Sequence, residues 1–343
     1  MKHGSEHRYS RQILLPEIGP EGQERLGTSR VAVVGCGALG SVIASLLARA
    51  GVGSLRIIDR DFVEPSNLQR QLLFDESDAK SALPKAVAAE RHLRAANAEV
   101  AIEGVVADVT PRNVEELLAG RDLILDGTDN FETRFLINDF AVKNGVPWIY
   151  AAVVGMRGVC LPIVPGKTAC LACIAESGNG EALADEETCD TVGVLGAAAA
   201  AVASLASAAA IRMLTGAGDG IAAKLTSIDV WNGEQRNVRV ARDPDCRACA
   251  RREFTYLQGA VQPHVTMCGR DSVQIHERNR RIDLSGLGAR LGAVVTDVRR
   301  NDFLLRFRVA PYEVTVFSDG RAIIKGTRDP GVARSLYARY LGA

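Results

Sequence analysis

Residues 35–40, GCGALG, lie between a β-branched run and an apolar, alanine-containing run, and they have the spacing of a phosphate-binding loop. Gly35 allows a tight turn, Gly37 lets a phosphate approach the backbone, and Gly40 permits close packing of a helix on a strand. The following helix would add backbone N–H donors and the positive end of its dipole. Asp59 ends the next predicted strand, where its carboxylate can accept hydrogen bonds from ribose hydroxyls. The pattern predicts a site for a nucleotide with an adenosine ribose.

A dense group of polar residues follows the loop. It comprises Asp61, the segment SNLQRQ (66–71) and Lys85. Negative charge spreads over the phosphate oxygens during attack at phosphorus, so Arg70 and Lys85 are suited to neutralise a triphosphate. Asp129 could hold Mg²⁺, which prefers carboxylate and phosphate oxygens. Taken singly, each residue could be an ordinary surface charge. Together they favour a triphosphate over NAD, whose hydride transfer needs no such cluster.

Two CxxC pairs form a second candidate site. Cys170 and Cys173 make one pair, and Cys246 and Cys249 make the other, with 72 residues between them. Four thiolates match a tetrahedral structural zinc ion, held here as a long-range staple of the chain. A site closed by four protein ligands has no open coordination position, so we expect a structural role. The alternative is four free or redox-active thiols.

The segments around these residues alternate between strand and helix patterns. Continuous β-branched runs are typical of strands that are covered on both faces. The expected strands cover residues 31–35, 54–61, 100–106, 123–126 and 146–153, and the expected helices cover residues 41–51, 85–96 and 131–143. Such alternation predicts an α/β fold with a doubly wound, mostly parallel, Rossmann-like sheet.

The pattern changes after about residue 255. Four segments with alternating polarity, the last of them preceded by an Asp-Gly turn, predict an antiparallel meander: residues 294–298, 303–309, 312–317 and 321–326. A final helix begins near Pro330. We therefore expect a large domain over residues 1–255 that carries the zinc site, and a small α+β domain over residues 256–343.

Length and composition exclude several classes of protein. The 343 residues suffice for about two domains, and 47% hydrophobic with 24% charged residues excludes a disordered chain. The 41 Lys and Arg balance 41 Asp and Glu, which argues against nucleic acid or an anionic membrane as a partner. Residues 192–211 carry no charge, but their alanines gain little from lipid, so a buried helix is favoured over a membrane span. The polar N-terminus lacks a signal-peptide core, and we expect a cytoplasmic protein.

Over roughly residues 5–250, the chain resembles the ThiF/MoeB/HesA family, relatives of the ubiquitin-activating enzymes. The matching segments are RYSRQILLPEIG (8–19), GCGALG (35–40), IIDRDFVEPSNLQRQLLF (57–74), Lys85, DGTDN (126–130), TACLAC (168–173), TCDTVGVLG (188–196) and DPDCRACA (243–250). The resemblance implies that ATP adenylates the C-terminal Gly carboxylate of a small ubiquitin-like protein with a Gly-Gly tail, and that pyrophosphate is released. The activated carrier would later become a thiocarboxylate for thiamin or molybdopterin synthesis.

The resemblance also implies roles for individual residues. The residues expected to surround ATP are Gly35, Gly37, Ala38, Gly40, Asp59, Asp61, Ser66, Asn67, Leu68, Gln69, Arg70, Gln71, Lys85, Asp129 and Asn130. Among them, Asp59 would bind the ribose, Arg70 and Lys85 the phosphates, and Asp129 the Mg²⁺ ion. Arg11 would reach the ATP of the other subunit as an arginine finger, which implies a homodimer.

Two features concern sulfur. Cys189 ends a polar loop, residues 176–190, with six acids and no basic residue. In the family, a cysteine here can take part in sulfur transfer, although nearby carboxylates oppose thiolate formation, and a dispensable loop thiol is the alternative. The C-terminal segment holds only Cys268 and does not match a rhodanese active-site loop, so we expect a separate sulfur donor.

Several alternatives stay open. The carrier could be ThiS-like or MoaD-like, and a related enzyme could activate another carboxylate, of a peptide or an amino acid. An NAD-dependent oxidoreductase would share the glycine loop but not the need for Arg11, Arg70 and Lys85. A non-catalytic dimeric scaffold would have a degenerate site, whereas the polar set here is complete.

Overall fold

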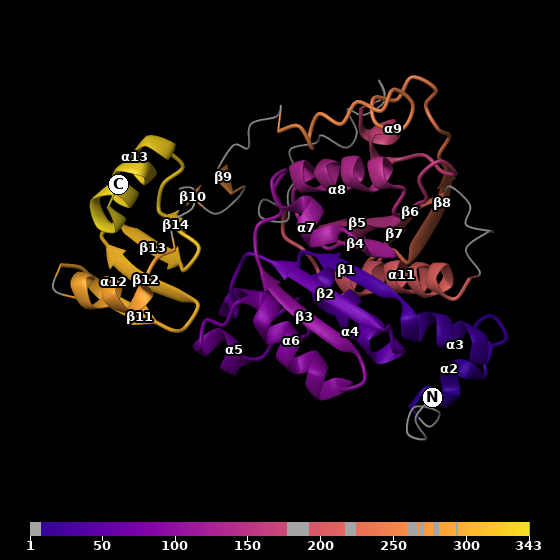
Figure 1. Ribbon diagram of the computed structural model, residues 1–343, viewed down its shortest axis with the longest axis horizontal. Helices are drawn as coiled ribbons and strands as arrows, with labels where there is room; N and C mark the ends of the chain where they lie inside the picture. Colours follow the sequence, from indigo (N-terminus) through magenta and orange to yellow (C-terminus); the bar gives the residue numbers. More distant parts are fainter. Residues whose placement is uncertain are drawn as a thin grey trace. The chain divides into compact units, whose positions relative to one another are not determined.

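The computed structural model describes residues 8–176, 192–216, 224–259, 266–267, 271–276, 281–292 and 294–342 (Figure 1). The chain divides into two units, residues 1–261 and 262–343. Each unit has a sheet and a hydrophobic core of its own.

The first unit is built on an eight-stranded sheet with the order β3-β2-β1-β4-β5-β6-β7-β8. Its strands are β1 (Arg30–Val34), β2 (Ser54–Asp59), β3 (Ala101–Val106), β4 (Leu123–Asp126), β5 (Trp148–Val154), β6 (Arg157–Ile163), β7 (Lys224–Asp229) and β8 (Glu234–Arg239). Neighbouring strands from β3 to β5 run parallel, and those from β5 to β8 run antiparallel. The predicted mostly parallel sheet is therefore confirmed. The strand order reverses between β1 and β4, and ligands of open α/β sheets bind beside the carboxyl ends of the strands at such a point.

Helices cover both faces of this sheet (Figure 1). One layer contains α4 (Gly40–Ala50), α6 (Lys85–Ala96) and α11 (Gly196–Leu214), and the other contains α7 (Val114–Leu118), α8 (Phe131–Asn144) and α9 (Leu171–Ala175). Successive side chains of β1 alternate between the two layers: Val31 and Val33 join the first core, and Ala32 and Val34 join the second. Strands apolar on both sides thus explain the continuous hydrophobic runs of the sequence.

Shorter helices complete the first unit: α2 (Ser10–Ile13), α3 (Gly19–Thr28), the 3₁₀ helix η1 (Pro65–Asn67) and α5 (Glu76–Lys80). The N-terminal arm is fixed to the far end of α4. Side-chain amides of Gln12 and Gln23 both donate to the carbonyl of Ala50, each at 3.0 Å. The arm therefore lies at the opposite end of α4 from the glycine loop.

The uncharged segment forms α11, which begins at Gly196. By length and composition alone, this helix could cross a membrane. Its small residues, among them Ala198, Val202 and Ala206, are buried in the core shared with α4, β5 and β6. The buried face of α11 packs inside the first unit, as the sequence predicts.

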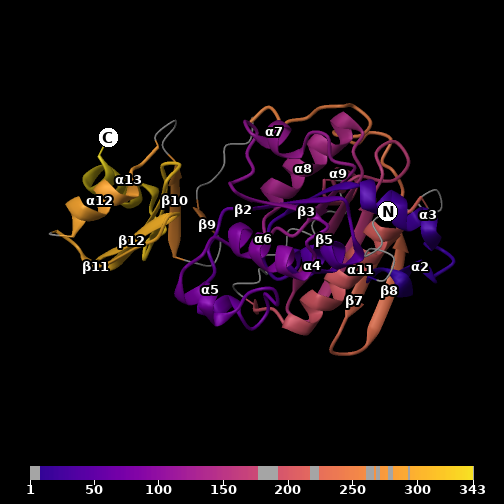
Figure 2. The same cartoon turned by 60° about the horizontal axis from the view of Figure 1, so that its bottom comes forward.

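The second unit contains a six-stranded antiparallel sheet with the order β11-β12-β13-β14-β10-β9. Its elements are β9 (Thr266–Met267), β10 (Ser272–His276), α12 (Leu284–Leu291), β11 (Thr296–Arg300), β12 (Leu304–Val309), β13 (Tyr312–Phe317), β14 (Arg321–Lys325) and α13 (Pro330–Leu341). Figure 2 shows both helices on the same side of the sheet, where Leu287 and Tyr337 share a core with Phe307 and Val316.

Candidate active site and four-cysteine cluster

The glycine loop follows β1 and lies against the turn after β4. The N–H of Gly35 donates to the carbonyl of Ile58 at 2.7 Å, and the N–H of Gly127 donates to that of Val34 at 2.8 Å. Gly35 has a φ of +84°, and a Cβ there would lie 2.6 Å from the oxygen of Gly127. A Cβ on Gly40 would overlap the carbonyl of Gly35. These glycines are therefore required by the backbone packing itself.

Gly37 differs from the other glycines of the loop. The nearest heavy atom to a Cβ built there is Nε2 of Gln71, at 3.8 Å. The protein thus leaves room beside Gly37 while it closes the space beside Gly35 and Gly40. This is the position where a phosphate was expected to approach the backbone, and the space fits that expectation.

Asp59 ends β2 with its carboxylate held by two backbone donors. Oδ2 accepts from the N–H of Cys36 at 2.6 Å, and Oδ1 accepts from the N–H of Asp61 at 2.7 Å. Burial raises the pKa of the Asp59 carboxyl above its ordinary value, more than nearby Lys85 lowers it. Each oxygen keeps a lone pair, so the fixed carboxylate can still accept from ribose hydroxyls.

Lys85 begins α6 and is buried beside Asp61. Its Nζ lies 3.3 Å from Oδ2 of Asp61, and its backbone N–H donates to the carbonyl of the same residue. The two chain segments are therefore joined twice. Only 5% of the Lys85 side chain is exposed, so its charge acts in a partly dry environment, where electrostatic interactions are stronger than in water.

The segment SNLQRQ (66–71) brings two buried amides to the same region. Nδ2 of Asn67 and Oε1 of Gln71 are buried, and neither has a hydrogen-bond partner within the described part of the chain. Unpaired buried polar atoms are costly, and a bound polar ligand would supply their partners. Arg70 donates to the carbonyl of Ser66 at 2.8 Å.

The remaining residues of this segment are Ser66, Leu68 and Gln69. Leu68 contacts the first core, and Gln69 is exposed. A Cβ on Gly196 would lie 2.8 Å from the carbonyl oxygen of Gln69, so the start of α11 supports the segment closely.

The turn after β4 carries Asp129, which is exposed, and Asn130, which caps α8 by accepting from the N–H of Thr133 at 2.8 Å. Asp126 is fully buried and pairs with Arg134 at 3.1 Å. Arg134 also donates to the carbonyl of Thr128 at 2.6 Å. This arginine therefore fixes the part of the turn that leads into Asp129.

Sequence reasoning did not identify two cations near Asp129. Burial lowers the pKa of Arg60, but Asp108, Asp61 and Asp129 raise it more. Burial also lowers the pKa of Arg134. Asp126, and more weakly Asp129, raise this pKa by a larger amount. For Arg134 a signal was present, because it lies four residues after the cap of α8 and thus one helical turn away.

Arg11 and Ala38 complete the predicted nucleotide set. Ala38 is partly buried in the loop. Arg11 lies exposed on α2, at the end of α4 far from the loop. One chain therefore does not bring Arg11 to its own glycine loop.

The four predicted cysteines come together in the described structure. The Sγ–Sγ distances are 3.8 Å for Cys170–Cys173, 3.6 Å for Cys170–Cys246 and 3.4 Å for Cys173–Cys249. All four sulfurs lie within 4.8 Å of one another. Tetrahedral zinc with bonds of about 2.3 Å separates its sulfur ligands by about 3.8 Å, so this cluster fits a zinc ion. Cys189 lies outside the described residues.

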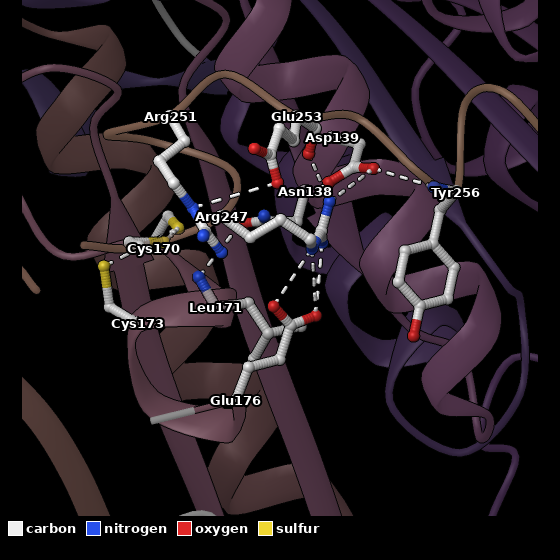
Figure 3. A network of polar contacts seen from close by, with 11 residues as sticks. Asn138, Asp139, Cys170, Leu171, Cys173, Glu176, Arg247, Arg251, Glu253 and Tyr256 are labelled. Atoms are coloured by element: carbon white, nitrogen blue, oxygen red, sulfur yellow. Dashed lines mark hydrogen bonds and ion pairs between the residues drawn. The ribbon is translucent and has the colours of Figure 1, made fainter. Parts of the chain in front are cut away.

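An arginine within the second CxxC pair connects the cluster to its surroundings (Figure 3). Arg247 pairs with Asp139 on α8 at 3.1 Å and with Glu176 after α9 at 3.0 Å. Asp139 also accepts from the N–H of Tyr256 at 3.0 Å. Arg247 therefore joins the cysteine cluster, α8 and the end of α9.

Comparisons with known proteins identify relatives of this chain. The sulfur carrier protein ThiS adenylyltransferase of Bacillus subtilis (strain 168) is 41% identical over 339 residues, which cover 98% of this chain and 99% of that protein. The SAMP-activating enzyme E1 of Haloferax volcanii is 37% identical over 242 residues, 71% of this chain and 88% of that protein. The adenylyltransferase and sulfurtransferase MOCS3 of Bos taurus is 36% identical over 76% of this chain and 56% of that protein.

A solved structure has the same architecture. The crystal structure of E. coli MccB with ATP superposes with a TM-score of 0.61 and 25% identity, and the match covers 71% of this chain and 74% of that one. The sequence model of the ThiF family matches residues 9–248. The chain belongs to the ThiF family.

Proposed function

We propose that this protein is an ATP-dependent adenylyltransferase that activates the C-terminal Gly carboxylate of a ubiquitin-like sulfur-carrier protein. One observation carries the proposal: the space beside Gly37 lies next to the side chain of Gln71, near a fixed Asp59 carboxylate and the buried ammonium of Lys85. Relatives named adenylyltransferases support the reaction class.

The reaction needs positioning and charge neutralisation above all. A carboxylate oxygen of the carrier attacks the α-phosphorus of ATP, the bond from that phosphorus to the bridging oxygen breaks, and pyrophosphate leaves with the electron pair. The C-terminal carboxylate is already ionised near neutral pH, so no general base is required. Arg70 and Lys85 neutralise the phosphates, and the N–H groups of the loop at the start of α4 add donors.

Two metal ions belong to the proposal. Asp129 is an exposed carboxylate beside the glycine loop, and it would hold Mg²⁺, which supplies charge neutralisation on the phosphates. Cys170, Cys173, Cys246 and Cys249 would hold zinc in a structural role.

The similarity to the ThiS adenylyltransferase over nearly the full length of both chains bears on which carrier protein is the partner. Similarity to the ThiS adenylyltransferase includes the C-terminal unit, whereas the match to MOCS3 covers 76% of this chain. We therefore favour a ThiS-like over a MoaD-like carrier. The protein acts as a cytoplasmic homodimer in which Arg11 reaches the partner's ATP, with a separate protein as sulfur donor. Cys189 stays a candidate for sulfur transfer. The peptide or amino-acid carboxylate is not favoured.

ATP–pyrophosphate exchange tests this function. We expect exchange that depends on a ThiS-like carrier ending in Gly-Gly, with a weaker response to a MoaD-like carrier. A carrier that lacks its last glycine is the matched control and should give none. Carrier-independent exchange with a free amino acid or peptide, or a rise in melting temperature with NAD but not with ATP, would overturn the proposal.

A further inference from the structure

A cavity lies at the amino ends of β1, β2 and β3, at the opposite end of these strands from the glycine loop. Its volume is about 600 Å³. Four arginines and one acid are the charged residues of its wall: Arg30, Arg56, Arg94, Arg121 and Glu103. The nucleotide site uses none of these residues, because it stands at the carboxyl ends of the same strands.

Three of the arginines are held by carboxylates. Arg30 pairs with Asp122 at 3.2 Å, Arg56 with Glu103 at 2.8 Å, and Arg94 with Glu90 at 2.7 Å. Arg56 also donates to the carbonyls at the end of α7, and Arg94 to that of Ile102. These contacts fix the guanidinium groups around the cavity before any ligand arrives, which lowers the entropy lost on binding.

Arg121 differs from the other three. Its Nε is buried and has no hydrogen-bond partner within the described residues. Burial lowers the pKa of Arg121 below its ordinary value, and the like charge of Arg56 adds to this effect. With three carboxylates for four guanidinium groups, the wall keeps one uncompensated positive charge. An anion in the cavity would compensate this charge and would accept hydrogen bonds from the part of the Arg121 guanidinium that lines the cavity.

Apart from Ser54, the rest of the wall is apolar. Leu55 and Ile102 are buried beneath the cavity, and Val100 and Ala101 lie beside them. Carboxylates already serve as the single-charge partners of Arg30, Arg56 and Arg94. Four arginines line one cavity, and an oxyanion with three or more oxygens, as phosphate has, can accept hydrogen bonds from several of them at once.

We propose that this cavity binds a small phosphate-bearing molecule, with the phosphate on Arg121 and an attached apolar group on the side of Leu55 and Val100. The site is separate from the nucleotide site, and its existence does not depend on the adenylation proposed above.

The test measures binding of phenyl phosphate and of inorganic phosphate by calorimetry. Saturating Mg²⁺ and a non-hydrolysable ATP analogue keep the nucleotide site filled throughout. We expect phenyl phosphate to bind more tightly than inorganic phosphate. Arg121→Leu should weaken it about tenfold or more, because a charge-assisted hydrogen bond is lost. Arg91→Leu, at an exposed position of α6 outside the cavity, is the matched control and should bind like the natural protein.

Melting temperatures without ligand show whether Arg121→Leu folds, and Arg30→Gln is a second variant that should also weaken binding. Equal binding by the natural protein and both variants would overturn the proposal, as would the absence of phosphate binding. Binding of polyglutamate without phenyl phosphate would assign the arginines to a protein partner instead, and would overturn it too.

Discussion

The glycines of the loop serve two different purposes. A Cβ on Gly40 meets the Gly35 carbonyl, whereas a Cβ on Gly37 meets nothing nearer than 3.8 Å. We therefore expect Gly40→Ala to lower the free energy of unfolding by about 1–3 kcal/mol, since the backbone must move. Gly37→Ala should leave stability unchanged but slow exchange on the order of 10²-fold, because ATP phosphates would be displaced.

Denaturant unfolding and ATP–pyrophosphate exchange on both variants separate these effects. Gly27→Ala serves as a control, because a Cβ at this helical position has no heavy atom within 4 Å. If Gly37→Ala binds and uses ATP normally, the phosphate does not lie against this residue.

Arg70 and Lys85 share a predicted role on the phosphates but differ in their surroundings. Each change to Ala should slow exchange on the order of 10²–10³-fold, by analogy with lost donors to a developing negative charge. Lys85→Ala should also lower stability by about 1–3 kcal/mol, because it removes a buried charge partner of the Asp61 carboxylate. Within the described part of the chain, the Arg70 side chain hydrogen-bonds only to the carbonyl of Ser66, so Arg70→Ala should unfold nearly as the natural protein does.

Exchange rates and melting temperatures of the two variants test whether both lose activity while only Lys85→Ala loses stability. Near-normal exchange by both would remove the phosphate assignment. A stability loss in Arg70→Ala as large as that in Lys85→Ala would contradict the surroundings described here.

The two CxxC pairs join segments that are far apart in the sequence. One precedes and enters α9, and the other follows β8. We expect about one zinc ion per chain by elemental analysis. Chelation should lower the melting temperature, since the metal binds the folded chain. Cys170→Ser should lose the zinc, while Cys160→Ser, which alters a buried cysteine outside the cluster, should keep it. Native protein purified without chelator that contains no zinc would refute the assignment.

Arg247 holds the second CxxC pair against α8. Asp139 is fully buried, so Arg247→Ala would leave its carboxylate with only the Tyr256 N–H among its described donors. The expected loss is about 3 kcal/mol in the free energy of unfolding. Arg251→Ala is the control: its partner Glu253 is 3.8 Å away and both side chains are more than half exposed, so the change should cost less than about 0.5 kcal/mol. Equal effects in denaturant unfolding would contradict this anchoring role.

The sequence predicts the parallel strands β1 to β5 and the antiparallel strands β11 to β14. The helix from Lys85 to Ala96 and the strand from Leu123 to Asp126 have the expected bounds, because apolar periodicity and clear end signals coincide there. Strands β6 to β10 were missed, although β6 and β10 are largely buried. β8 is exposed along its whole length and β7 mostly polar, so neither has the hydrophobic pattern on which a strand assignment depends.

Some residues of the candidate site can be predicted from the sequence, and others cannot. The glycine-loop motif identifies Gly35 and Asp59, and the CxxC motif identifies the four cysteines. Phosphate binding and zinc binding restrict the residue types and their spacing, so both sites can be read from the sequence. Gly127 shows no such signal. Its need for glycine comes from the approach of the Gly35 carbonyl, 2.5 Å from a Cβ built there, and this contact between distant segments exists only in the folded chain.

Each unit has its own sheet, and the likeness to the Bacillus subtilis relative includes both. The family match ends at residue 248, within the first unit. The nucleotide site and the cysteine cluster both belong to that first unit. The second unit should therefore be tested for a role in partner recognition. The ThiS-like carrier is the first ligand to test.

The position of Arg11 has a consequence for the assembly. In one chain it lies at the end of α4 far from the loop, so its proposed role requires a second chain. Arg11→Ala and Lys85→Ala homodimers should both be nearly inactive. In a heterodimer of the two variants, one composite site carries both changes and the other carries neither, so co-expressed, doubly tagged heterodimers should regain about half of the natural exchange rate. A heterodimer as inactive as its parents, or a fully active monomer, would contradict the proposed reach of Arg11 into the site of the other subunit.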